Sequence, residues 1–308
     1  TCAASTGIAN SSARSSSAMP EWIIRLIETP EEMDAVQELQ RLVWPGPETE
    51  VIPAHTLLAV VHNGGLLLGA FVNEKLVGAA WGFPGFYSTP DGPRLKHCSH
   101  ILAVHPEWRD SGIGFGLKRA QWQMVRHQGL DLITWTYDPL LSRNAYLNIA
   151  RLGAVCNTYR RSEYGDMRDG LNVGLPSDRF QVDWWVNTRR VEHRLGRRRR
   201  PALVLDHFLA ADVSLCAAVP DPAGWPRPLE DVPSLGGRLL LVEIPVDFLA
   251  LKEADLALAR DWRFYARQVF ETAFAAGYLV TDFVFDQTGE RPRSLYVLTY
   301  GESTLDAP

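Results

Sequence analysis

The sequence predicts an α/β protein in which helices flank a mixed central sheet. Apolar segments of strand length alternate with segments of helical period, in the order β-α-β-β-β-α-β-α over the first half of the chain. Glycine- and proline-containing turns separate these segments. The chain has 308 residues, of which 46% are hydrophobic, so it can bury a large core without disulfides or a structural metal.

The N-terminal elements are a strand, a helix and a hairpin. An apolar run over residues 22–27 predicts the strand. Thr29-Pro30, followed by two glutamates, is the start signal of a helix that runs to about Val43. Two further apolar runs with a polar turn between them predict an antiparallel hairpin of residues 66–72 and 76–81.

Strands and helices then alternate to the end of the chain. The first half continues with a strand, an amphipathic helix, a strand and a short helix, at residues 100–104, 113–127, 132–137 and 144–152. The second half contains a strand, a long helix and two further strands, at residues 239–244, 253–275, 279–285 and 295–299.

Composition divides the chain into four parts. Residues 1–18 are rich in serine and alanine and predict a disordered tail. Two folded parts are expected, at residues 19–187 and 201–308. Between them, residues 188–200 contain seven arginines and one glutamate. We interpret this run as a solvated linker, with a phosphate-binding patch or a site for an anionic partner as the alternative.

Charge and cysteine usage exclude several classes of protein. The 31 basic and 36 acidic residues give a net charge of −5, which argues against a nucleic-acid binder. No apolar run reaches the roughly 18 residues of a membrane-spanning helix, so no membrane partner is expected. The four cysteines lack CxxC spacing, which argues against a disulfide framework or a zinc site and favours a reducing, cytoplasmic location.

The segment that carries chemistry runs from Leu102 to Leu117. A strand ending in Val104-His105-Pro106 leads through residues 109–114, Arg-Asp-Ser-Gly-Ile-Gly, into a helix. Amides at a helix N-terminus lack intrahelical partners and lie at the positive end of the dipole, so they suit phosphate. Gly112 and Gly114 allow a ligand to approach the backbone closely. The spacing fits neither a P-loop nor a Rossmann fingerprint.

Arg109-x-x-Gly112-x-Gly114 after a strand ending in Val-x-Pro resembles motif A of the GNAT superfamily, the acetyl-CoA-dependent N-acyltransferases. The order of elements also agrees: strand, helices, hairpin, strand, loop, helix, strand, helix. The resemblance covers about residues 20–187. Three further segments resemble a branch of predicted GNAT acetyltransferases: Trp135-Thr136-Tyr137-Asp138-Pro139-Leu140, Leu152-Gly153-Ala154 and Tyr164-Gly165-Asp166-Met167.

The resemblance implies acetyl-CoA or another acyl-CoA as cosubstrate, without a metal. It implies that backbone amides along one loop hold the CoA pyrophosphate: Arg109, Asp110, Ser111, Gly112, Ile113, Gly114 and Phe115. Backbone groups of Leu102 and Val104 would pair with the pantetheine arm, and one such N–H would stabilise the tetrahedral oxyanion. Asn144 approximately matches a position that bonds the pantetheine; its alternative role is a helix cap.

The base departs from the family pattern. Many GNAT enzymes carry a glutamate on the motif A strand, but Cys98–Val104 contains no carboxylate. His97 and His100 are the nearest titratable groups, and a histidine has a suitable pKa for a base near neutral pH. We take His100 as the candidate base, with a packed or solvated side chain as the alternative.

The acid departs from the pattern as well. Many family members place a tyrosine four residues before the glycine that ends the next helix, and Ile149 stands there in this sequence. Tyr146, Tyr159 and Tyr164 are the available substitutes. We rank Tyr164 first because a tyrosine before Gly-Asp indicates a turn near the site; a partly buried core position is its alternative.

The second half contains a faint echo of the first. Gly129–Asp138 and Gly277–Asp286 share a spacing and a pattern, and each follows a long amphipathic helix. No glycine lies between Pro245 and Gly277, so a backbone site for pyrophosphate is not expected there. We therefore expect a degenerate GNAT-like α/β half that completes the sheet, covers the acceptor site or forms a face of a homodimer.

Two functions follow from this sequence. The first is an acyltransferase that moves an acetyl or other acyl group from acyl-CoA to a small amine by direct attack on the thioester. The alternative is a catalytically weak acyl-CoA-binding module with a regulatory or interaction role, which the departures at the base and acid positions motivate.

Overall fold

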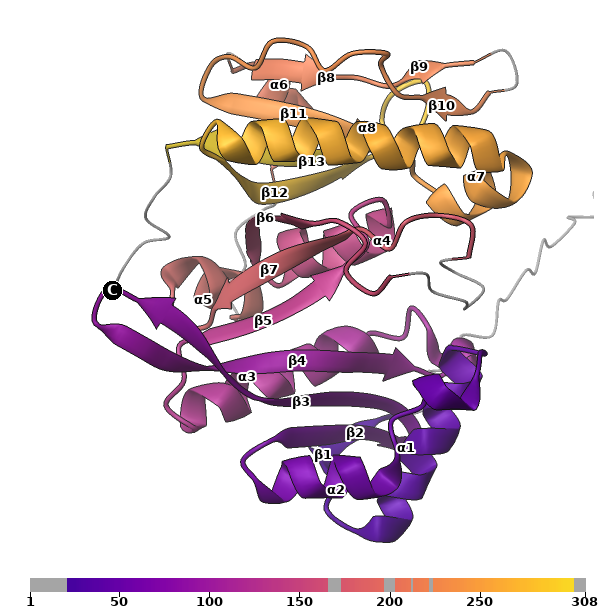
Figure 1. The fold of residues 1–308 in the computed structure, drawn as a ribbon, viewed down its shortest axis with the longest axis vertical. Helices are drawn as coiled ribbons and strands as arrows, with labels where there is room; N and C mark the ends of the chain where they lie inside the picture. The colour runs from indigo at the N-terminus through magenta and orange to yellow at the C-terminus, as the bar shows by residue number, and fades with distance from the viewer. Residues whose placement is uncertain (1–20, 166–172, 197–202, 212, 222–223, 302–308) are drawn as a thin grey trace, which may run out of the picture.

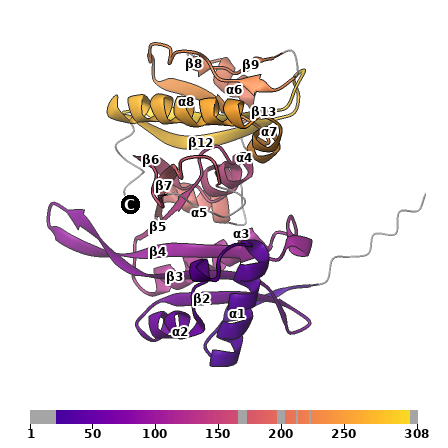
Figure 2. The ribbon, with the colours of Figure 1, turned by 45° about the vertical axis from the view of Figure 1, so that its right-hand side comes forward.

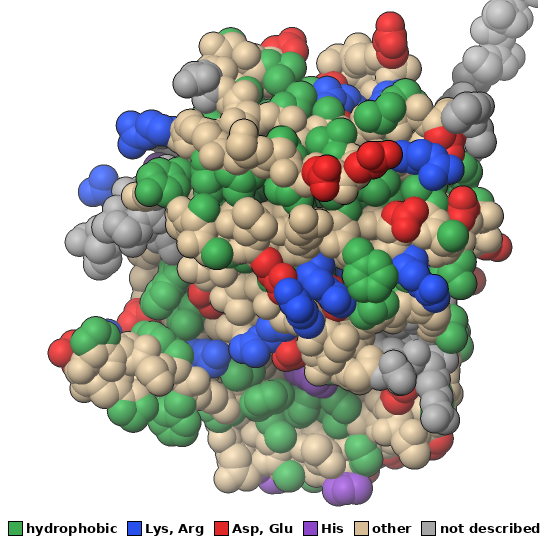
Figure 3. Space-filling model, turned by 45° about the horizontal axis from the view of Figure 1, so that its top comes forward, with side chains coloured by type: hydrophobic (Ala, Val, Ile, Leu, Met, Phe, Trp, Pro, Cys, Tyr) green, Lys and Arg blue, Asp and Glu red, His purple; other side chains and the backbone are tan. Residues whose placement is uncertain are grey.

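The computed structural model describes residues 21–165, 173–196, 203–211, 213–221 and 224–301. The expected disordered tail and the four arginines at residues 197–200 lie outside these ranges. Within them, no helix has both the length and the apolar character to cross a bilayer. Basic and acidic side chains are interspersed on the face shown in Figure 3, so this face has no field of a single sign.

The elements of the N-terminal half include all those predicted, in the predicted order, and also a helix at residues 54–62 and strands at residues 155–160 and 179–185 that were not predicted. The elements are β1 (Ile23–Leu26), α1 (Pro30–Val43), η1 (Glu48–Glu50), α2 (Ala54–His62), β2 (Leu66–Val72), β3 (Lys75–Thr89), β4 (Gly92–Val104), η2 (Pro106–Trp108), α3 (Ile113–His127), β5 (Leu132–Tyr137), α4 (Ser142–Ala145), η3 (Tyr146–Arg151), β6 (Val155–Arg160) and β7 (Arg179–Trp185). β3 and β4 are longer than predicted, because they pair as an antiparallel arm that projects from the body (Figures 1 and 2).

The C-terminal half is also α/β, as predicted. Its elements are α5 (Arg189–Leu195), α6 (Leu205–Leu209), β8 (Val213–Cys216), β9 (Val219–Pro220), β10 (Pro226–Arg227), β11 (Leu239–Ile244), α7 (Phe248–Ala254), α8 (Leu256–Ala275), β12 (Tyr278–Asp286) and β13 (Arg293–Tyr300). The predicted helix over residues 253–275 is two helices, since Asp255 caps a new helix with its side chain.

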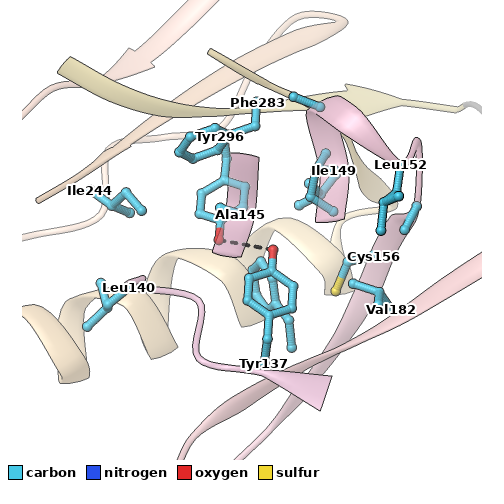
Figure 4. Packing of buried hydrophobic residues seen from close by; sticks show 14 of the residues in the cluster. Tyr137, Leu140, Ala145, Ile149, Leu152, Cys156, Val182, Ile244, Phe283 and Tyr296 are labelled. Carbon is cyan, nitrogen blue, oxygen red and sulfur yellow. Dashed lines mark hydrogen bonds between the residues drawn. The ribbon is translucent and has the colours of Figure 1, made fainter. Parts of the chain in front are cut away.

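One sheet runs through both halves. Its eleven strands follow the order β1-β2-β3-β4-β5-β7-β6-β12-β13-β11-β8, and the halves meet where β12 pairs with β6. A single buried cluster also spans the junction: Figure 4 shows Tyr137 of β5 and Tyr296 of β13 hydrogen-bonded through their hydroxyls at 3.1 Å among apolar side chains. The expected boundary near residues 188–200 therefore does not separate two cores.

The strand–helix–strand echo of the second half is present as β11, α8 and β12, but its sheet order differs from that of the first half. β4 and β5 pair with each other directly. β11 and β12 are parallel, yet β13 lies between them and pairs with both. The gap that opens between β4 and β5 therefore has no counterpart between β11 and β12.

The arginine-rich run corrects the expectation of a solvated linker. Its first part is the helix α5, which buries Val191 and Leu195. Arg190 donates to the carbonyl of Gly153 at 3.0 Å. Arg194 donates to the carbonyl of Ala150 at 2.6 Å and to a carboxylate of β12 at 2.7 Å. These arginines satisfy carbonyls at the end of η3, where intrahelical donors run out.

Helices cover the two faces of the N-terminal sheet separately. Alternate residues of a strand point to opposite faces. Leu66 and Leu68 of β2 therefore pack in the cluster of α3, whereas Leu67 and Phe71 pack in the cluster of α1 and α2.

Candidate functional site

β4 and β5 diverge in the middle of the sheet. The two strands are parallel and pair at only two positions, His97 with Ile133 and Cys98 with Thr134. Beyond Cys98, β4 keeps β3 as its partner and β5 keeps β7. The sheet thus opens between β4 and β5 toward their carboxyl ends.

A cavity of about 600 Å³ occupies this opening. Trp44, the C-cap of α1, lines it from one face of the sheet, and Lys118 of α3 lines it from the other. Because α1 and α3 cover opposite faces, the cavity passes through the sheet. The C-terminal half contributes Leu249 of α7 to its wall. The remaining lining comes from Gln40 of α1, η1 and the residues after it, β4, β5 and the turn that follows it, the α4–η3 helix, Tyr164 and Arg179.

The glycine loop after β4 has the geometry expected of an anion-binding turn. Gly112 is the N-cap of α3 with a φ of +85°, and no side chain caps the helix there. No atom lies within 4 Å of the position that a Cβ at Gly112 would take. Asp110 also has a positive φ, +66°. The first turn of α3 thus presents backbone amides without intrahelical partners at an open surface.

This loop borders the opening between the strands. A Cβ placed on Gly114 would lie 3.7 Å from Val104 and 4.0 Å from Leu102, so the start of α3 rests on the diverging end of β4. Asp110 forms an ion pair with Arg143 of α4 at 2.5 Å, which ties the loop to the other side of the opening. Of the predicted cofactor residues, Leu102 and Asn144 line the cavity, and the loop of residues 109–115 lies outside its lining.

The helix after β5 places two amides on the cavity. Asn144 in α4 and Asn148 in η3 both line it, and Asn148 is 5% exposed. In the described part of the chain, neither side-chain amide has a hydrogen-bond partner. η3 is a π-helical turn, a feature often found at functional sites. The sequence analysis missed Asn148, although its spacing of four residues from Asn144 places both on one helix face.

His100 lies on a β-bulge. The register between β3 and β4 shifts so that Trp81 opposes Ile101 and Gly82 opposes Ser99, which leaves His100 as the extra residue. The imidazole packs edge-on against Trp81 at 5.6 Å, on the face that α1 covers. Burial lowers the pKa of His100 below its usual value. The side chain lines the cavity, so the sequence candidate is near the opening.

Tyr164 also lines the cavity, from the segment between β6 and β7. Its hydroxyl lies 2.6 Å from the Thr136 hydroxyl of β5. The other tyrosines take different places: Tyr159 donates to Asp178 at 2.9 Å, and Tyr146 is 42% exposed and outside the lining. Ile149 is fully buried in the core.

Asp138 ends β5 at the cavity and is held by the C-terminal half. Arg263 of α8 donates to both of its carboxylate oxygens, at 2.9 and 2.5 Å. The carboxylate also accepts from the Leu140 amide at 2.9 Å and so caps the turn that follows β5. Asp138 is therefore paired and fixed in position.

A buried lysine at the base of the opening was missed by the sequence analysis. Lys118 is 2% exposed, and its ammonium group donates to Ser99 at 2.8 Å and to Gln121 at 3.0 Å. Gln121 in turn faces His97 at 3.2 Å. The sequence does indicate burial here, because Gln121 falls at the helical spacing of the buried residues Leu117 and Val125. Lys118 lies one helical turn before Gln121.

Several solved structures are similar to this chain at low sequence identity. The chain is similar to an acetyltransferase of the GNAT family from Streptococcus pneumoniae (15% identity, TM-score 0.40, 53% of this chain and 98% of that chain). It is similar to the ribosomal-protein-S18-alanine N-acetyltransferase of Escherichia coli, with 16% identity, a TM-score of 0.40, and coverage of 54% of this chain and 94% of that chain. A third similar structure is aminoglycoside 6'-acetyltransferase type Ii, with 19% identity, a TM-score of 0.43, and coverage of 54% of this chain and 99% of that chain. No protein-family model and no curated protein matches this chain.

The N-terminal half has the α/β fold class and the order of elements that the sequence predicted. The glycine loop joins β4 to α3 as expected, and β4 and β5 diverge beside it.

Proposed function

We propose that this protein is an acyltransferase that moves an acetyl or other acyl group from acyl-CoA to a small amine. The observation that carries the proposal is the cavity between β4 and β5, which is open through the sheet and bordered by the glycine loop. A thioester entering from one face and an amine entering from the other would meet in it.

In this proposal the loop of residues 109–115 holds the CoA pyrophosphate through its backbone amides. The pantetheine arm runs from there along the free edge of β4, past Leu102, toward the point where the strands separate. The unpartnered amides of Asn144 and Asn148 support this path, because they supply hydrogen bonds that the polar arm needs and that the protein leaves unmade. A backbone N–H of β4 polarises the thioester carbonyl.

The acceptor amine enters from the face that α1 covers. Trp44, Glu50, His100 and Tyr164 line that part of the cavity. The Glu50 carboxylate suits a cationic or amine-bearing acceptor, and Trp44 offers an aromatic surface for it. We propose His100 and Tyr164 as groups that contact the acceptor.

The C-terminal half supports the acceptor site in this proposal and binds no second CoA. Leu249 lines the cavity, and Arg263 fixes Asp138 at its edge. The separation of β11 from β12 by β13 removes the opening that a second CoA would need. We assign CoA binding to residues 19–187.

Release of free CoA thiol from acetyl-CoA, measured with a panel of small amines, tests the proposal against the alternative of a binding module. The proposal predicts thiol release that depends on at least one amine. Tight acetyl-CoA binding without amine-dependent release across primary amines, amino acids and polyamines would favour the module. The observations that motivate this alternative are the lack of a carboxylate on the motif A strand and the presence of Ile149 where many family members have a tyrosine.

A further inference from the structure

A buried cluster around Lys118 borders the cavity, because Lys118 and Ser99 both line it, and the proposed function gives the cluster no role. It consists of Lys118 and Gln121 on α3 and His97 and Ser99 on β4. The Lys118 ammonium donates to Ser99 and Gln121, and it lies 3.7 Å from the centre of the Trp135 ring on β5. Trp135 and Ser99 are the first residues of β5 and β4 beyond their last pairing. The cluster thus closes the base of the opening.

Lys118 has only neutral partners in the described part of the chain. Its hydrogen bonds go to a hydroxyl and an amide, and its other close neighbours are the Trp135 and Trp184 rings. The other titratable side chain in the cluster is His97, whose pKa is lowered to about 3 by burial and by the lysine charge, so the ring is neutral. A buried ammonium without a counterion is costly. Burial accordingly lowers the pKa of Lys118 to about 7.

The position of Lys118 relative to the loop matters for the chemistry. The glycine loop follows Val104, and Ser99 lies five residues earlier on β4, about 16 Å along the strand at roughly 3.3 Å per residue. A pantetheine arm that starts at the loop and follows the opening ends against Ser99 and Lys118. Because its pKa is about 7, Lys118 is partly uncharged at neutral pH and can accept a proton at that point.

We propose that Lys118 is the catalytic base of acyl transfer; this inference rests on the proposed function. The neutral acceptor amine attacks the thioester carbon, so that an N–C bond forms. Lys118 takes the proton that the attacking nitrogen loses. The C–S bond then breaks, and the Lys118 ammonium returns the proton to the departing thiolate. The products are the amide and free CoA, and Lys118 is neutral again.

The geometry favours Lys118 over the base candidate found from the sequence. His100 packs against Trp81 and Phe83 on the face of α1, where the acceptor enters. Lys118 lies in the opening itself, between Ser99 and the Trp135 ring. A group at the meeting point of the two strands can reach both the attacking nitrogen and the leaving sulfur.

The chain offers a direct test because it contains only four lysines, Lys75, Lys96, Lys118 and Lys252. Protein labelled with ¹³C at the lysine ε-carbon gives four resonances, whose assignment follows from Lys118→Met and, as a matched surface control, Lys75→Met. We expect the Lys118 resonance alone to titrate near neutral pH and to shift when acetyl-CoA is added.

Kinetics complete the test with an amine acceptor found by thiol release. Lys118→Met should bind acetyl-CoA in calorimetry but lose about 100-fold or more in turnover, and Lys118→Arg should not restore it. Turnover should fall as the pH drops below about 7, because Lys118 becomes protonated. His100→Ala should show the same fall. The inference is overturned if wild-type protein binds acetyl-CoA while the Lys118 resonance neither titrates near neutral pH nor shifts, or if Lys118→Met keeps its turnover. Failure of wild-type protein to bind acetyl-CoA overturns the proposed function, and this inference with it.

Discussion

The pairing of Asp138 with Arg263 predicts that the C-terminal half stabilises the wall of the cavity. Both side chains are almost fully buried, at 9% and 2% exposed, and two hydrogen bonds join them. Arg263→Met keeps the length of the side chain but leaves a buried carboxylate without its main partner. Breaking a buried ion pair in this way costs about 3–5 kcal/mol. Because Arg179 remains 3.9 Å from Asp138, we expect the lower end, about 3 kcal/mol.

Urea unfolding of wild-type and variant proteins measures this loss. Arg161→Met is the matched control, because Arg161 makes a similar two-bond contact with Glu271 of the same helix at an exposed position, and its loss should be much smaller. The double variant Arg263→Met, Asp138→Asn should recover part of the stability, since the buried carboxylate is gone. A loss below about 1 kcal/mol for Arg263→Met, or no recovery in the double variant, would refute the reasoning.

Three further predictions concern side chains that are buried or paired in the fold. Since burial lowers the pKa of Lys118 from 10.5 to about 7, the unfolded chain binds more protons between these values, and wild-type stability should rise with pH across that window relative to Lys118→Met. Urea midpoints measured from about pH 7 to about pH 10 check this, and a constant difference contradicts it. Burial raises the pKa of Cys156, so alkylation mapped by mass spectrometry should reach Cys98 well before Cys156; equal rates would be inconsistent with the packing. Arg194→Met should cost about 1–2 kcal/mol of unfolding free energy, because it removes hydrogen bonds to the end of η3 and to Asp282; an unchanged urea midpoint would argue against this cap.

The elements with strong local signals could be predicted from the sequence. The Thr29-Pro30 start fixed α1, and the observed α3 and β5 have the bounds that periodicity and turn residues indicated. The glycine loop was found because it depends on local spacing. The arm of β3 and β4 extends further than predicted because cross-strand pairing lengthened both strands past their apolar runs.

Features that depend on contacts between distant residues could not be predicted. The Asp138–Arg263 pair joins residues 125 positions apart. The helix α5 is held in place by Arg194, which donates to the Ala150 carbonyl of η3. A bulge in strand pairing is likewise invisible in one strand alone, so the position of His100 was not predicted. Lys118 was hidden for a different reason. A lysine on a helix ordinarily marks the solvent face, and only the three-dimensional neighbourhood of Ser99 and Trp135 shows it to be buried.

Calorimetric titration with acetyl-CoA tests the central claim most directly, and the chain supplies a close control. Gly112→Asp introduces a side chain at a positive φ in the loop that we assign to the pyrophosphate. Gly129→Asp does the same just beyond the far end of α3, where φ is +75° and no atom lies within 4 Å of the added Cβ. We predict one binding site in the wild-type protein, loss of binding in Gly112→Asp, and unchanged binding in Gly129→Asp. No binding by wild-type protein, or equal binding by both variants, would contradict the assignment of the loop and of the acyl-CoA site.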